Sequence, residues 1–175
     1  MNAWRLLYTF ALLLVSAAAA HADAGLFTAL HIGPVRLSFP GAWTFNSGQR
    51  HIKGTAANGE AVDILVFVSK EDVAPTSHTA LTDRIRREAQ QMSKLFIEDS
   101  GWVVRHLTEL PAPPGKVLFA AASEELTREG EKQHSLIYVL GSAKAQVFLS
   151  LTGKGGAVKA FEVFDAVATS QQWSE

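Results

Sequence analysis

The sequence predicts an α+β domain, in which an antiparallel β-sheet with a C-terminal three-stranded meander packs against a long central helix and a C-terminal helix. Two observations predict this class. Strand-like runs are grouped together instead of alternating one by one with helices. The last three runs are joined by short connections, which favours antiparallel neighbours. We therefore expect one globular domain over residues 35–173, preceded by a lead-in over residues 23–34.

The first 22 residues have the parts of a secretory signal peptide. Arg5 precedes the apolar run LLYTFALLLVSAAAA, and the small residues Ala20 and Ala22 precede a cleavage point after Ala22. A retained membrane anchor is the competing interpretation, but the apolar run is near the lower length limit for a span and no basic flank follows it. The sequence predicts a periplasmic or secreted protein that uses the Sec route and has no stable membrane insertion after cleavage.

Composition excludes several classes of function. The chain has 16 basic and 17 acidic side chains, so no excess positive charge is present to bind a phosphate backbone, and nucleic acid is not an expected partner. It has no cysteine, which excludes a disulfide scaffold, a thiol nucleophile, a cysteine-ligated metal and a lipid-modified N-terminal cysteine. The expected partner is a protein or a small ligand.

The first half of the domain is predicted to be strands joined by tight turns. Alternating apolar residues predict a strand over 35–39, and Pro40–Gly41 ends it in a type II turn, because glycine supplies the positive φ. The extended segment WTF follows. Asn58–Gly59 lies between the extended runs HIKGTA and AVDILVFVS, a pattern typical of a β-hairpin. The second run is apolar on both faces, which predicts a central strand covered on both sides.

The second half begins with a helix. Apolar residues at helical spacing from Leu81 to Phe96 predict a helix over residues 79–97. The run GWVVRHL predicts a strand, the proline-rich stretch ELPAPPGK a stiff loop, and the runs KVLFAAAS, QHSLIYVLGS and AQVFLSLTG the closing meander. A stripe at helical spacing predicts the C-terminal helix. Its members are Phe161, Phe164, Val167 and Ala168.

No set of residues meets the requirements of a catalytic, metal-binding or cofactor-binding site, and no cofactor is predicted. The chain lacks a G-x-S-x-G motif, and its histidines lack metal-ligand spacing. We expect them to be separate surface or edge residues: His31, His51, His78, His106 and His134. Four glutamates cluster around a predicted hairpin that also contains Arg128 and Lys132, and we expect a solvated loop there. They are Glu124, Glu125, Glu129 and Glu131.

Two groups of residues are candidate contacts. The motif TGKGGA follows a strand and opens a helix, where free N–H groups can hold an anion. Lys154, Gly155 and Gly156 are therefore a candidate anion site, with a flexible connection as the competing interpretation because the rest of a P-loop is missing. Trp43 and Trp102 are candidate partner contacts, with partial burial and a satisfied indole N–H as the alternative.

The order of these motifs resembles the PsbP-like fold, which includes the DcrB-like small α+β proteins. VRLSFPGAW resembles an opening strand that leads into a Pro-x-x-Trp corner, and ALTDRIRREAQQM resembles the long helix. The run from KVLFAAAS to the C-terminal QQW resembles the closing meander and helix, which end near Phe164 and Ser170. The similarity covers nearly all of residues 33–173. That fold hosts binding and accessory roles, so the resemblance implies no catalytic residue.

The sequence thus predicts an exported, non-catalytic binding or accessory protein of the bacterial cell envelope, acting through an exposed sheet face or edge near Trp43. One alternative is a small envelope hydrolase whose active site the sequence does not reveal. Another is association with a membrane surface through the basic face of the predicted central helix, which otherwise is the solvated face of a core helix. That face contains Arg84, Arg86, Arg87 and Lys94.

Overall fold

The structure, a computed structural model, describes residues 27–47, 50–70, 75–97 and 103–174. The expected signal peptide over 1–22, its cleavage point after Ala22, and Trp102 lie outside these residues. The strands are β1 (Phe27–Ile32), β2 (Val35–Pro40), β3 (Trp43–Ser47), β4 (His51–Ala56), β5 (Ala61–Lys70), β6 (Val103–Leu110), β7 (Val117–Leu126), β8 (Lys132–Gly141), β9 (Ala145–Lys154) and β10 (Gln172–Trp173). The helices are α2 (His78–Ile97) and α3 (Ala157–Thr169).

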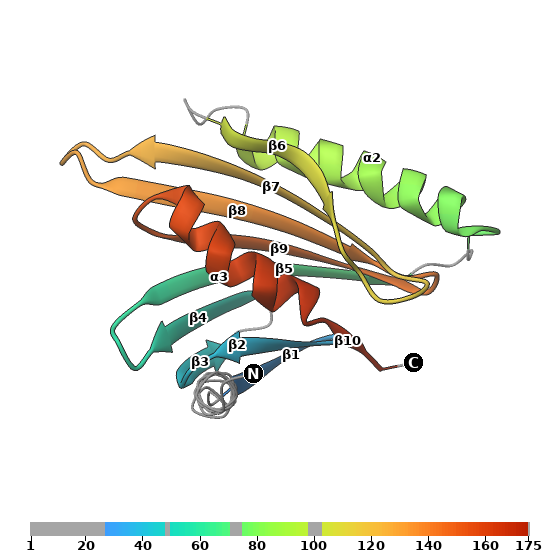
Figure 1. The fold of residues 1–175 in the computed structure, drawn as a ribbon, viewed down its shortest axis with the longest axis horizontal. Helices are drawn as coiled ribbons and strands as arrows, with labels where there is room; N and C mark the ends of the chain where they lie inside the picture. The colour runs from blue at the N-terminus through green and yellow to red at the C-terminus, as the bar shows by residue number, and fades with distance from the viewer. Residues whose placement is uncertain (1–26, 48–49, 71–74, 98–102, 175) are drawn as a thin grey trace, which may run out of the picture.

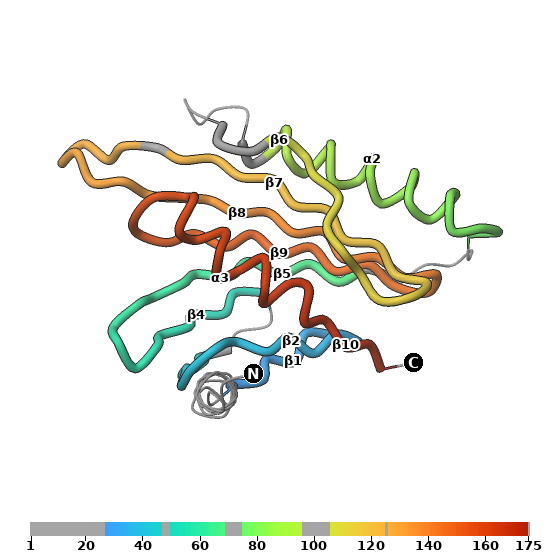
Figure 2. The backbone as a smooth tube through the Cα atoms, viewed as in Figure 1, coloured from blue at the N-terminus to red at the C-terminus, as the bar shows by residue number. Residues whose placement is uncertain are grey.

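The strands form two antiparallel sheets, which confirms the predicted α+β class. The main sheet has seven strands in the order β3-β4-β5-β9-β8-β7-β6, and the small sheet has three in the order β1-β2-β10. Pairing of β5 with β9 joins the N-terminal hairpin to the predicted meander β7-β8-β9, as the chain trace shows (Figure 2). The small sheet was not expected as a separate unit, and its strand β1 lies within the segment 23–34.

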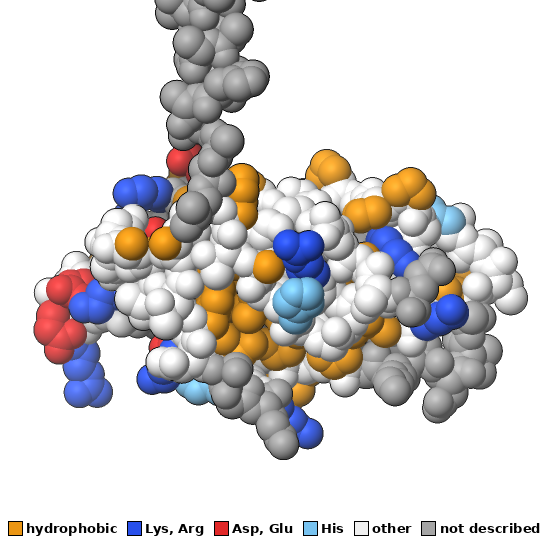
Figure 3. Space-filling model, turned by 90° about the horizontal axis from the view of Figure 1, so that it is seen from below, with side chains coloured by type: hydrophobic (Ala, Val, Ile, Leu, Met, Phe, Trp, Pro, Cys, Tyr) orange, Lys and Arg blue, Asp and Glu red, His pale blue; other side chains and the backbone are white. Residues whose placement is uncertain are grey.

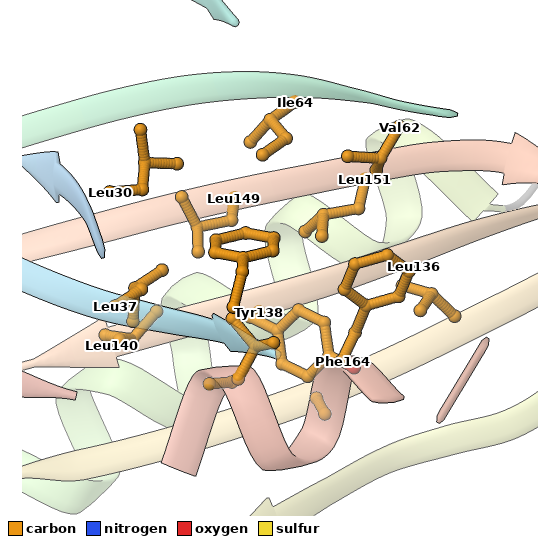
Figure 4. Packing of buried hydrophobic residues seen from close by; sticks show 14 of the residues in the cluster. Leu30, Leu37, Val62, Ile64, Leu136, Tyr138, Leu140, Leu149, Leu151 and Phe164 are labelled. Atoms are coloured by element: carbon orange, nitrogen blue, oxygen red, sulfur yellow. The ribbon is translucent and has the colours of Figure 1, made fainter. Parts of the chain in front are cut away.

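Helices and the small sheet cover the two faces of the main sheet unequally. Helix α3 contacts β6, β7 and β8 on one face and also reaches β2, so α3 and the small sheet lie on the same side (Figure 1). Helix α2 packs on the opposite face, against β6, β7 and β8. The larger core cluster lies under α3 and the small sheet, where Leu37, Tyr138 and Phe164 converge (Figure 4). A smaller cluster lies under α2.

Within the described residues, the central strand β5 is covered on one face only, which corrects the prediction of cover on both faces. Val62, Ile64 and Val66 are buried in the larger core cluster. On the other face Phe67 stays 37% exposed and packs against the ring of Phe148, with the ring centroids 5.7 Å apart. The reason is topological, because α2 contacts β6–β8 and β5 lies beyond β9 in the sheet.

The chain passes from the small sheet to the main sheet at the Pro40–Gly41 corner. Gly41 has φ of 83°, which confirms the positive φ expected of this turn. The Thr28 hydroxyl donates to the Gly41 carbonyl and accepts from the Trp43 backbone N–H, each at 2.9 Å. Trp43 is only 8% exposed, and its indole N–H donates to the Pro40 carbonyl. The ring of Trp43 therefore belongs to the core, which corrects the expectation that it forms a partner contact.

Helix α2 is positioned by its cap and by a close approach to β8. The Ser77 hydroxyl accepts from the Ala80 N–H, as expected for an N-cap. Leu81, Ile85 and Ala89 are buried as predicted, whereas Leu95, assigned to the same stripe, is 76% exposed. Ile85 lies directly over Gly141 of β8, where a Cβ atom would collide with its side chain. Gly141 therefore sets how closely α2 approaches the sheet.

Replacing Gly141 by alanine should weaken the packing of α2. Overpacking of a filled core costs about 1–3 kcal/mol, and we expect a loss of that size in the free energy of unfolding from urea titration. The matched control is the same change in an Ile85→Ala background, where the colliding atoms are gone. Equal losses in the two backgrounds would show that Ile85 does not set this approach.

Replacing Trp43 by alanine should remove the centre of the corner. Truncating a buried aromatic side chain costs about 3–5 kcal/mol, and we expect that loss in urea unfolding. Trp43→Phe keeps a ring beside Phe39 and Phe45 but loses the hydrogen bond to Pro40, so its loss should be smaller. A loss below about 1 kcal/mol for Trp43→Ala, the size of an ordinary surface substitution, would contradict this account.

Candidate binding groove

The N-terminus of α3, expected as an anion site, already holds a carboxylate of the chain itself. Glu124 of β7 accepts the Ala157 N–H at 2.8 Å with one carboxylate oxygen, and its other oxygen lies 2.7 Å from the Lys132 ammonium group. Gly156 is the N-cap residue and has no side chain to cap the helix, so Glu124 takes that role. The exposed Lys154 lies 3.4 Å from Glu131.

Glu124 corrects the expectation that all four glutamates of this hairpin are solvated. Its side chain is 6% exposed. The hydrogen bond from Lys132, followed by that from the Ala157 N–H, lowers the pKa of the Glu124 carboxyl against the opposing effect of burial. The alternation of β7 contained the signal, because Leu118, Ala120 and Ala122 face the same core and Glu124 is the next residue in that series.

Glu124 belongs to a row of residues that crosses the main sheet. In register, Glu124 lies opposite His134, and His134 lies opposite Gly153. Toward the other edge of the same sheet, Phe45 of β3 lies opposite Gly54 of β4, and Gly54 lies opposite Val62 of β5. Large side chains lean over both glycines: a Cβ on Gly153 would lie 2.7 Å from His134 Nε2, and one on Gly54 would lie 2.8 Å from the Phe45 ring.

An open groove of about 730 Å³ lies over this row. Gly54, Val62 and Gly153 are among its lining residues, together with His134 and Phe164 of α3. The groove is thus bounded by the β4–β5 hairpin, by the start of β8, by the end of β9 and by α3. Sequence reasoning missed it, because it depends on which strands pair and on where α3 stops covering the sheet.

His134 is the polar side chain of most interest at this groove. It is 7% exposed, which corrects the expectation of a surface or edge histidine. Its Nδ1 lies 3.2 Å from the Gly155 carbonyl oxygen. Its Nε2 is buried and has no hydrogen-bond partner within the described ranges. The alternation of β8 contained this signal too, because Leu136, Tyr138 and Leu140 continue the same buried face.

The other histidines do not join His134. His51 of β4 lies 3.4 Å from Asp63 and is about half exposed, and His106 is exposed on β6 at the far edge of the main sheet. Within the residues that the structure describes, no group of three or more His, Asp or Glu side chains could hold a metal ion.

The basic face of α2 is partly used inside the fold. Arg84 donates to the Ser142 carbonyl at 2.9 Å. Arg86 pairs with Asp83 and Glu109 and lies over the Phe119 ring. Two of the four cations considered for membrane binding thus have protein partners. No helix in the described segments is long and apolar enough to cross a membrane.

Exposed hydrophobic side chains form a second surface feature. Seen from below, they lie open across the middle of the molecule, with a histidine and a basic side chain over them (Figure 3). The large exposed residues are spread over several elements, including Phe27 of β1, Val68 of β5 and Val158 of α3. The groove differs from this surface because it includes a buried polar atom with an unmet hydrogen bond.

Comparison with known proteins finds similarity in structure and none in sequence, since no protein-family model and no curated protein match the chain. The solution structure of the cyanobacterial PsbP protein (CyanoP) from Synechocystis superposes with a TM-score of 0.54 over 86% of this chain and 95% of that one, at 13% identity. The chain has a PsbP-like fold.

Two further structures are similar to the PsbP-like domain. A protein from Bacteroides thetaiotaomicron has a TM-score of 0.52 and 10% identity over 81% of this chain, and this chain spans only 46% of that protein. LpqN of Mycobacterium tuberculosis, described as involved in cell envelope biogenesis, has a TM-score of 0.47 and 14% identity over 91% of this chain and 96% of its own. At 13% identity the likeness to CyanoP establishes the fold and nothing about function.

Replacing Glu124 by glutamine should lower stability in a pH-dependent way. The pKa of Glu124 is lowered in the fold from its ordinary value of 4.5. Its stabilising effect is therefore fully present above that value and is lost as the pH falls through the lower, folded-state pKa. We expect the difference in Tm between the wild type and Glu124→Gln to be largest near neutral pH and to shrink in acid.

Glu129→Gln, at an exposed position of the same hairpin, is the matched control and should leave Tm nearly unchanged throughout. A pH-independent difference for Glu124→Gln would show that the charge of Glu124 does not stabilise the start of α3.

Proposed function

We propose that the chain is an exported, non-catalytic binding or accessory protein of the bacterial cell envelope, and that the groove beside α3 is its contact site. The observation that carries this proposal is the open groove with a buried, unpartnered nitrogen, His134 Nε2, at its wall. A concave site with a few convergent polar groups is the usual form of a binding site. The secretory pattern of residues 1–22 supports the cellular location.

The contacts at the groove support binding over hydrolysis. A histidine that serves as general base holds a hydroxyl nucleophile on one ring nitrogen and is oriented through the other, often by a carboxylate. His134 has a backbone carbonyl on Nδ1, and Nε2 lies over a glycine. The nearby carboxylate of Glu124 is engaged by Lys132 and by the start of α3.

The proposal moves the contact site from the Trp43 ring to the neighbouring groove. Because Trp43 is packed against Phe39 and Phe45, its indole offers little surface to a partner. The groove lies at the same end of β4 as this corner, because Trp43 is opposite Ala56, the last residue of β4, and the neighbouring Thr55 lines the groove.

Photo-crosslinking in cells tests this function. The full chain carries a photo-reactive residue at Thr55, which lines the groove, or at Arg87, on the exposed side of α2. We expect one discrete envelope product from the Thr55 position and none from the Arg87 position. Protein recovered from the same cells should begin at Asp23 by mass spectrometry.

Equal crosslinking from both positions, or from Arg87 alone, would contradict the placement of the contact site. Turnover of ester or peptide substrates that is lost in His134→Phe would contradict the non-catalytic assignment. A cytoplasmic, uncleaved chain would contradict export.

A further inference from the structure

The chemistry of the groove narrows the class of ligand, an inference that rests on the proposed binding function. The layer formed by α3 and the small sheet stops short of one corner of the main sheet, near the β4–β5 connection (Figure 1). The groove opens at that corner. Its lining includes Gly54 and Gly153 of the sheet and the apolar residues Val62 and Phe164.

The tautomer of the neutral His134 ring follows from its contact with Gly155. A carbonyl oxygen can only accept a hydrogen bond, so Nδ1, which faces the Gly155 oxygen at 3.2 Å, carries the proton of the neutral ring. Nε2 then has a free lone pair and acts as an acceptor. It is buried over Gly153 without a donor in the described part of the chain. A buried acceptor without a donor costs free energy that a bound donor would recover.

The charges around the groove do not favour a charged ligand. The charged residues that line it are of both signs, namely Lys53 and Lys154 with Glu60 and Asp63. Asp63 lies 3.4 Å from His51, and Lys154 lies 3.4 Å from Glu131. Behind His134, the carboxylate of Glu124 is neutralised by Lys132 and by the N-terminus of α3. Among the described residues, the groove lining therefore has two charges of each sign, with no formal net charge.

We infer that the groove binds a neutral ligand that has an apolar body and a hydroxyl or amide N–H group. The donor group bonds to Nε2 of His134, and the apolar body lies against Val62 and Phe164. Gly153 is essential to this arrangement, because any side chain there would displace the His134 ring. The expected ligands therefore share two properties: one hydrogen-bond donor group and no net charge.

A matched pair of probes tests the inference on the mature chain by NMR, with ¹⁵N-labelled histidine to follow the imidazole nitrogens. Benzyl alcohol presents a hydroxyl donor, and benzyl methyl ether has a similar shape without one. We expect benzyl alcohol to shift the Nε2 resonance of His134 and the amide resonances of Gly153 and Gly155. The ether should bind about fivefold to tenfold more weakly, the amount expected for one hydrogen bond.

Two variants separate the hydrogen bond from simple apolar binding. His134→Phe keeps a ring of similar size but removes the acceptor, so it should bind the alcohol and the ether equally. His106→Phe, at an exposed position on β6, should keep the wild-type preference. Amide spectra of both variants show whether the fold is retained, and His134→Gln serves as a second variant if His134→Phe does not fold.

Three results would overturn the inference. They are equal affinity of the wild type for both probes, no shift at the solubility limit of benzyl alcohol, and an Nε2 resonance that reports a retained water in the presence of the alcohol. If any of these occurs while crosslinks still form at Thr55, the ligand class is wrong and the proposed function stands. If the alcohol binds but no crosslink forms, the inference stands and the proposed partner contact fails.

Discussion

The rest of the fold depends on the corner that joins the two sheets. Phe39 belongs to the small sheet and Trp43 to the main sheet, yet their rings pack in one core, with centroids 5.4 Å apart. Only a sharp turn can bring such close neighbours in the chain onto two layers, and Gly41 provides it. The Thr28 hydroxyl bonds to both sides of that turn and so fixes β1 to the same corner.

Once the small sheet is placed, the position of α3 and the opening beside it follow. Helix α3 packs between the small sheet and the strands β6–β8, and its N-terminus is held by Glu124. The helix therefore begins at the end of the row that contains His134 and Gly153. The groove opens where α3 and the small sheet end on this face of the main sheet, so the same contacts that stabilise the core determine the candidate site.

The sequence predicted the elements well because their signals are local. Periodicity located α2 and α3, and turn chemistry located the β4–β5 hairpin and the corner at Gly41. The division into two sheets was missed, because strand pairing joins residues far apart in the chain. Glu124 and His134 were missed because their residue types favour the surface, although their place in the alternating strands put them inside. Trp43 was a candidate contact residue because the local sequence does not distinguish a buried tryptophan from one at the rim of a binding site.

The shortest strand in the structure, β10, also bears on the order in which the strands pair during folding. Strand β10 pairs with β2 through Gln172 and Arg36, and the Ser174 N–H donates to the Pro34 carbonyl across 140 positions of sequence. The main sheet likewise cannot form until β9 reaches β5. Nearly the whole chain must therefore be released before either sheet is complete, and folding through such distant contacts is slow. The local pairs β1–β2 and β3–β4–β5 can form early in such a chain, whereas the pairs β5–β9 and β2–β10 close last.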